Sequence, residues 1–113
     1  MRSKILALSK NEDFKILLTK KKMSNKYVTI FFGNLANKNN QKFNISFVVK
    51  KKIGNAVKRN KVKRRLRNII NEAIKKIPLN FKFSYLVIAK STMLNNDYTN
   101  IKETLFQELN KIK

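Results

Sequence analysis

Positively charged side chains are concentrated in residues 50–67, where ten of the eighteen residues are Lys or Arg. Apolar residues recur within this stretch, and Gly54 and Asn55 interrupt it, which predicts a folded element rather than a basic tail. A basic surface that is anchored to a hydrophobic core can hold a polyanion in one orientation. The stretch therefore predicts binding of nucleic acid.

The charge of the whole chain supports this prediction. The formal net charge is +21 over 113 residues, and residues 14–71 contain 17 Lys or Arg and no carboxylate. Self-repulsion on this scale opposes a compact state unless a polyanion neutralises it. Nucleic acid is the expected partner, and an anionic membrane surface is the alternative.

The residue types that usually carry out hydrolysis are scarce. The chain has no Cys and no His, which removes the thiolate nucleophile and the commonest general base. Its six carboxylates do not converge in the sequence: Glu12 and Asp13 are adjacent, and the others are Glu72, Asp97, Glu103 and Glu108. We therefore expect no catalytic residue and no metal or cofactor held by the protein, and a partner should perform any chemistry.

The length predicts a single domain that spans residues 1–113. There is no run of about 18 apolar residues that could cross a membrane. The apolar residues 5–8 are too few for the core of a signal peptide. These features predict a cytoplasmic protein that makes no membrane contact.

The residues before the basic stretch predict one helix and two strands. Residues 9–12, Ser-Lys-Asn-Glu, fit a capping box, and the helix that follows should end near Lys20. Residues 27–32 and 43–50 are rich in β-branched and aromatic side chains, which favours strands. In the second strand an apolar face alternates with a mixed, partly solvated face, and the residues of the mixed face are Asn44, Ser46, Val48 and Lys50.

The basic stretch itself predicts a helix that Asn55 caps and that ends near Ile77, before Pro78. One stripe of this helix is apolar: Val62, Leu66, Ile69, Ile70, Ala73 and Ile77. The opposite side and both flanks of the stripe are basic. A buried strand at 83–89 and an amphipathic helix at 101–112 follow.

Residues 51–67 read Lys-Lys-Ile-Gly-Asn-Ala-Val-Lys-Arg-Asn-Lys-Val-Lys-Arg-Arg-Leu-Arg, and this run closely resembles the signature of the protein subunit of bacterial ribonuclease P. Residues 10–14 and 85–90 add further matches. The resemblance covers most of the chain and leaves residues 33–42 unconstrained.

The resemblance implies an α+β fold, a two-layer sandwich of order αβββαβα with a left-handed crossover through the basic helix. It implies that the protein binds a large catalytic RNA, one protein for each RNA. The complex would remove the 5′ leader of precursor tRNA, and the RNA would supply the magnesium-dependent hydrolysis. The protein would hold the single-stranded leader in a cleft between the first helix and the sheet.

The resemblance also implies which residues bind. The expected contacts to the catalytic RNA are Lys51, Lys52, Asn55, Arg59, Asn60, Lys61, Lys63, Arg64, Arg65 and Arg67. The expected lining of the leader cleft is Phe14, Leu18, Ser46, Val48 and Lys50, although Phe14 could instead be a core side chain.

Four positions depart from the family pattern. Lys61 replaces an Arg, which exchanges a forked phosphate contact for a point charge. Leu18 and Ile30 occupy positions where relatives often have aromatic residues, so base stacking should be weaker there. Ser84 replaces an Asp at the start of the late strand, which argues against a metal contact at that point.

Three other functions are alternatives to a ribonuclease P subunit. A ribosomal-type RNA-binding module would share the charge but not the full pattern of residues 51–67. A DNA-binding architectural protein would need helix-turn-helix spacing, which is not found. An independent nuclease would need converging catalytic groups.

Overall fold

In a computed structural model of the chain, residues 5–8, 11–35 and 42–112 are described. The strands are β1 (Ile5–Leu6), β2 (Lys21–Ser24), β3 (Val28–Gly33), β4 (Phe43–Val48) and β5 (Ser84–Ala89). The helices are α1 (Asn11–Leu17), α2 (Ala56–Lys76) and α3 (Tyr98–Lys111), with short 3₁₀ turns η1 (Lys51–Ile53) and η2 (Ser91–Met93).

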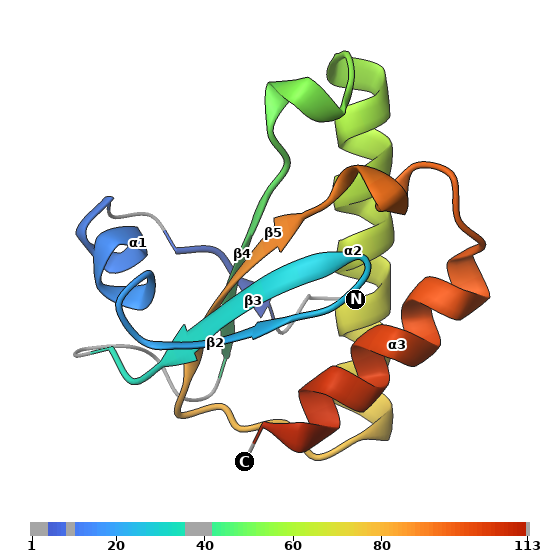
Figure 1. The fold of residues 1–113 in the computed structure, drawn as a ribbon. Coiled ribbons are helices and arrows are strands. Elements are labelled where there is room, and N and C mark those ends of the chain that lie inside the picture. The colour runs from blue at the N-terminus through green and yellow to red at the C-terminus, as the bar shows by residue number, and fades with distance from the viewer. Residues whose placement is uncertain (1–4, 9–10, 36–41, 113) are drawn as a thin grey trace.

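The strands form one mixed sheet in the order β1-β4-β5-β3-β2. The central pair β4–β5 is parallel, and β3 pairs antiparallel with both β5 and β2. The connection from β4 through α2 to β5 is left-handed, as Figure 1 shows, although parallel crossovers are nearly always right-handed. The fold is α+β, as the family resemblance implied, with the two-residue β1 added before α1.

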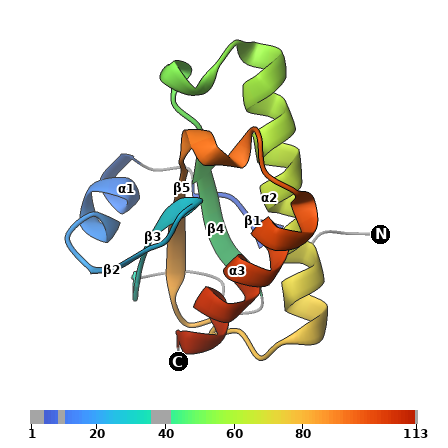
Figure 2. The ribbon, with the colours of Figure 1, turned by 45° about the vertical axis from the view of Figure 1, so that its right-hand side comes forward.

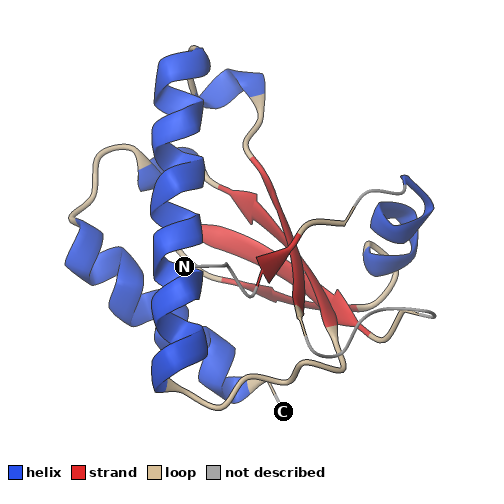
Figure 3. Ribbon diagram, turned by 180° about the vertical axis from the view of Figure 1, so that it is seen from behind, coloured by secondary structure: helices blue, strands red, loops and turns tan. Residues whose placement is uncertain are grey.

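Helices α2 and α3 cover one face of the sheet and form the main core with it (Figures 1 and 2). The sheet contributes alternate residues, among them Ile30, Ile45 and Val87, which are all almost fully buried. The stripe of α2 predicted from the sequence meets them: Val62, Leu66, Ile69, Ile70 and Ala73 are buried, and Ile77 is half-buried at the end. Figure 3 shows α2 and α3 crossing on this side of the sheet.

Helix α1 covers part of the opposite face, and a second, smaller core lies beneath it. Leu17 from α1 packs there with Leu8 and with Leu86 from β5. Phe14 and Phe31 contact this cluster while staying partly exposed. The mixed face of β4 lies on this side, as the family resemblance implied, but Asn44 and Ser46 are buried rather than solvated.

The element boundaries differ from the sequence predictions in several places. Helix α1 ends at Leu17 and is followed by turns, not by three more helical residues. The polar residues 20–25 contain β2, whose side chains are mostly exposed because it lies at the edge of the sheet. Helix α3 begins at Tyr98, three residues earlier than predicted. Ser9 and Lys10 of the predicted capping box, and residues 36–41 of the predicted loop, lie outside the described residues.

Ile30 does not lie where the family comparison suggested. It is 1% exposed in the main core and faces α2 and α3, away from α1. Its neighbour Phe31 faces α1, because adjacent residues of a strand point to opposite faces. An aromatic side chain is therefore present on the α1 side of β3, one residue later than expected.

Candidate nucleic-acid interface

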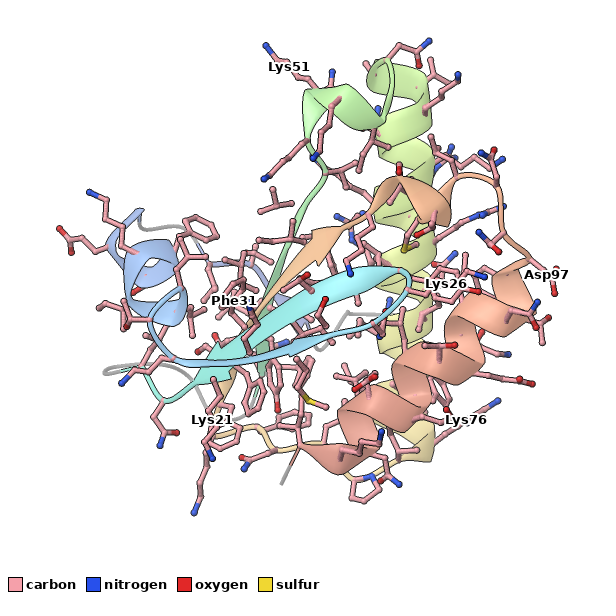
Figure 4. All side chains as sticks on the ribbon, in the orientation of Figure 1. Lys21, Lys26, Phe31, Lys51, Lys76 and Asp97 are labelled. Carbon is pink, nitrogen blue, oxygen red and sulfur yellow. The ribbon has the colours of Figure 1, made fainter. Side chains whose placement is uncertain are left out.

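The start of α2 is built by two neighbouring residues with distinct roles. Gly54 has a φ of 157°, a region that side chains disfavour, and turns the chain from η1 into the helix. The Asn55 side chain then accepts a hydrogen bond from the backbone N–H of Lys58 at 3.0 Å, which confirms the predicted cap. Lys51 and Lys52 stand exposed on η1 just before this turn, and Figure 4 shows Lys51 at one extremity of the molecule.

Most of the predicted RNA contacts are solvent-exposed around this helix start and along the outer side of α2. The exposed members are Lys51, Lys52, Asn55, Asn60, Lys61, Lys63, Arg64 and Arg67. None of their charged groups forms an ion pair with a residue in the described part of the chain. Since carboxylates are absent from residues 14–71, these cations remain available to an external polyanion.

Two of the predicted contacts, Arg59 and Arg65, are half-buried. Arg65 Nη1 donates hydrogen bonds to two backbone carbonyls, Met93 O at 3.1 Å and Asn96 O at 3.3 Å. These bonds tie the middle of α2 to the segment that leads into α3. The Nε of Arg59 is buried and has no hydrogen-bond partner among the described residues.

The outer side of α2 carries a shallow open groove of about 520 Å³. Its described lining combines one apolar side chain, Val57, with polar and cationic ones: Asn60, Lys63, Arg64 and Arg67. Val57 is 74% exposed, which is unusual for a branched apolar residue in this setting. Cations and a carboxamide beside an apolar contact can hold the backbone and a sugar or base of a nucleic acid.

The second predicted site, the cleft beneath α1, is partly formed by the residues expected there. Phe14 and Val48 are half-buried and pack against the same small cluster. Leu18 is 49% exposed, and Lys50 is exposed. Ser46 is engaged within the protein, because its Oγ accepts a hydrogen bond from the Leu8 N–H at 2.7 Å. Its position therefore fixes the segment after β1 against β4.

A hollow of about 310 Å³ connects this cleft with the basic helix. Phe14 of α1 and Ser46 of β4 line it on one side, and Lys63 and Arg67 of α2 line it on the other. The same two cations also line the outer groove of α2. The two sites predicted separately from the sequence are thus continuous through Lys63 and Arg67.

Sequence analysis missed two residues of the cleft. Phe31 and Ile88 are partly exposed on the α1 side of the sheet and pack on the same small cluster as Phe14. The alternation within 27–32 and 83–89 could have placed them on that face. Both segments are nearly continuous apolar runs, however, so neither face stands out as the solvated one.

Four ionisable groups outside these surfaces contribute to the fold: Glu72, Tyr85, Tyr98 and Lys102. Burial is the main cause that raises the pKa of Tyr98, and the nearby Glu72 carboxylate adds to it. Glu72 in turn pairs with Lys102 at 3.3 Å, which links α2 to α3. Burial also raises the pKa of Tyr85, whose hydroxyl donates to Asn80 O at 2.9 Å.

Within the described residues no group of three or more His, Cys, Asp or Glu comes together as a metal site. The helices of that part of the chain include none with the length and hydropathy to cross a membrane.

The family model described as Ribonuclease P matches residues 3–113. The chain belongs to the ribonuclease P protein family. The ribonuclease P protein component of Mesoplasma florum is 31% identical over 105 residues, which cover 93% of this chain and 89% of the relative. That of Listeria monocytogenes is 33% identical over 103 residues, with coverage of 90% and 83%. The solved ribonuclease P protein from Thermotoga maritima superposes with a TM-score of 0.78 at 26% identity and covers 96% of this chain and 98% of its own.

Proposed function

We propose that this protein is the subunit of a ribonuclease P ribonucleoprotein that binds the catalytic RNA along α2 and the 5′ leader of precursor tRNA beneath α1. Family membership supports the complex, and the exposed, unpaired cations of α2 support the assignment of surfaces. The observation that carries the proposal is the hollow lined by Phe14, Ser46, Lys63 and Arg67, because it joins the two surfaces.

The outer side of α2 suits a folded RNA. Its cations lie along one rigid helix, so they can meet phosphates at fixed spacing, and the N-terminal turns add backbone amides that favour anions. Lys63, Arg64 and Arg67 are the central contacts in this proposal. Arg65 acts differently, through its hydrogen bonds to the segment before α3.

The cleft beneath α1 suits a single strand. Phe14, Phe31 and Val48 offer partly exposed apolar surface, and Lys50 stands beside it. Stacking surface combined with a cationic track is the usual design for single-stranded nucleic acid. The leader would enter at Lys63 and Arg67, next to the catalytic RNA.

The hydrolysis itself is assigned to the RNA. The chain has no His or Cys, and its six carboxylates are dispersed, so the protein contributes binding and not bond cleavage. Magnesium would be held by the RNA. The complex, one protein for each RNA, would release the 5′ leader by endonucleolytic cleavage.

Reconstitution tests the proposal. Purified protein, a bacterial ribonuclease P RNA and a 5′-extended precursor tRNA are combined at low magnesium, and 5′ cleavage is followed on a gel. Accurate cleavage that needs both protein and RNA is expected. Tight RNA binding without any enhancement would favour a ribosomal-type RNA-binding module, and cleavage by the protein alone would favour an independent nuclease.

A further inference from the structure

The edge of the sheet farthest from β1 carries a second group of cations. Lys20, Lys21 and Lys22 are consecutive and exposed, in the turn after α1 and at the start of β2. They belong to the part of the chain that has no carboxylate, and none of the three forms an ion pair with another described residue. This edge can therefore attract a polyanion separately from α2.

The strand register divides these lysines between the two faces of the sheet. Lys22 lies opposite Phe31 and Lys21 lies opposite Phe32, and directly opposed residues of antiparallel strands share a face. Phe31 belongs to the cluster beneath α1, whereas Phe32 belongs to the main core. Lys22 is therefore on the cleft side and Lys21 is not. Figure 4 shows the Lys21 side chain extending away from the region of Phe31.

Gly33 holds Lys20 on the cleft side as well. A Cβ at Gly33 would lie 2.8 Å from Cγ and 2.9 Å from Cβ of Lys20, so the stem of Lys20 rests directly on the backbone of β3. Gly33 follows Phe31 by two residues and hence shares its face. Lys20 and Lys22 thus share the face of Phe31, on the β2 side of it.

We propose that Lys20 and Lys22 extend the leader cleft across β2 and bind phosphates in the 5′-distal part of the leader. This inference rests on the proposed function. The sheet order gives the direction in which the leader would cross the sheet. Strand β4 lines the hollow that reaches α2, and β2 lies three strand spacings, about 14 Å, from β4. Nucleotides near the cleavage site must stay close to the catalytic RNA on α2, so the far edge meets the distal nucleotides.

The test measures precursor tRNA binding to the assembled protein–RNA complex as a function of leader length and salt. Two precursors are compared, one with a long leader and one whose leader is too short to reach β2. The variants are Lys22→Gln, Lys20→Gln and their double variant. Lys21→Gln is the matched control, since it removes the same charge from the same strand but on the other face.

For the long leader, the slope of log affinity against log salt should become shallower by roughly 0.7 for each lysine removed. The short leader, mature tRNA and the Lys21→Gln variant should show the wild-type slope. Lys22→Arg should keep the wild-type behaviour, and unchanged affinity for the catalytic RNA should confirm that each variant is folded.

Equal losses for Lys21→Gln and Lys22→Gln, or equal losses for both leaders, would overturn the inference while leaving the proposed function in place. Wild-type complex that binds precursor and mature tRNA equally well would overturn the proposed function itself.

Discussion

At the scale of single residues, the structure separates cations that look alike in the sequence. Arg64 is exposed on the groove of α2, whereas its neighbour Arg65 is half-buried and bound to the carbonyls of Met93 and Asn96. The difference follows from the 100° step between helical neighbours, which turns Arg65 toward α3. Equal charge within one motif therefore does not mean equal function.

Substitution of these two arginines should have opposite signatures. Arg65→Met should lower the free energy of unfolding by about 1–2 kcal/mol, because the part-buried carbonyls of Met93 and Asn96 lose their hydrogen-bond donor. Arg64→Met should leave stability nearly unchanged and weaken binding to the catalytic RNA. Thermal melts and RNA titrations over a range of salt would measure both. A salt slope that changes for Arg65→Met but not for Arg64→Met would contradict this assignment.

A substitution of Phe14 distinguishes a role in leader binding from a role in core packing. Phe14→Ala should reduce affinity for leader-bearing precursor tRNA, since stacking on an aromatic side chain contributes about 1–3 kcal/mol for each base. Binding of mature tRNA by the assembled complex should stay unchanged. Leu17→Ala is the control, because Leu17 is fully buried beneath α1 and should lower stability without a leader-specific effect. Equal losses of affinity for precursor and mature tRNA in Phe14→Ala would show that Phe14 acts in packing and not in leader binding.

At the scale of elements, the sequence predicted α2 almost completely. Its cap, its apolar stripe and its outer cations all appear where the 3.6-residue period places them. Long amphipathic helices are predictable because one period fixes many residues at once. The edge strand β2 was not predicted, because it has no local apolar pattern. Its pairing with β3 comes from the register of the sheet.

The cleft was only partly predictable for a related reason. Its apolar members come from α1, β3, β4 and β5, and only the fold brings them together. Ser46 illustrates the limit, since alternation gave its face correctly but could not show that Leu8 would cover it. The left-handed crossover was predictable from the family resemblance alone, because physical preference favours the other hand.

The turn into α2 should be intolerant of a side chain. Gly54→Ala should lower the free energy of unfolding by about 1–3 kcal/mol, because φ lies at 157° and the new Cβ would meet Lys58 Cδ at 2.8 Å. Denaturant unfolding measures this change. Gly33→Ala is an informative comparison, since there the strain would arise from contact with the Lys20 stem and not from φ.

Tyr85 makes the sheet sensitive to alkaline pH. Burial raises its pKa, so the neutral phenol is favoured in the folded state. Its contribution to stability is complete below pH of about 10, the pKa of an unfolded tyrosine, and is lost as the pH rises above that value. Tyr85→Phe should be less stable at neutral pH, by about 1 kcal/mol, and should lose less stability above pH of about 10. Chemical denaturation across this pH range compares the two proteins; a parallel decline would contradict the role of Tyr85.

At the scale of the whole molecule, charge is distributed unevenly. The cations crowd onto η1, α2 and the β2 edge, whereas Asp97, Glu103 and Glu108 accompany α3. The surface of α3 therefore balances its own charge, and the rest of the molecule does not. Electrostatic attraction should dominate the affinity for RNA.

This imbalance predicts a steep dependence of binding on salt. If the protein contacts roughly six to ten phosphates, affinity for the catalytic RNA should fall by about 10³- to 10⁵-fold between about 50 and 200 mM salt. Filter binding or fluorescence titration measures the slope. A flat response would show that cation contacts do not drive assembly.

Through the left-handed crossover, the basic helix α2 connects the paired parallel strands β4 and β5 and packs on one face of the sheet. The buried stripe of α2 packs in the same core as residues of β4 and β5, so closure of that core also fixes the surface that carries the outer cations. By mass action, an RNA present at about 100 times its dissociation constant adds about 2.7 kcal/mol to the stability of the folded state. RNA binding should therefore raise the stability of the fold as well as complete the complex.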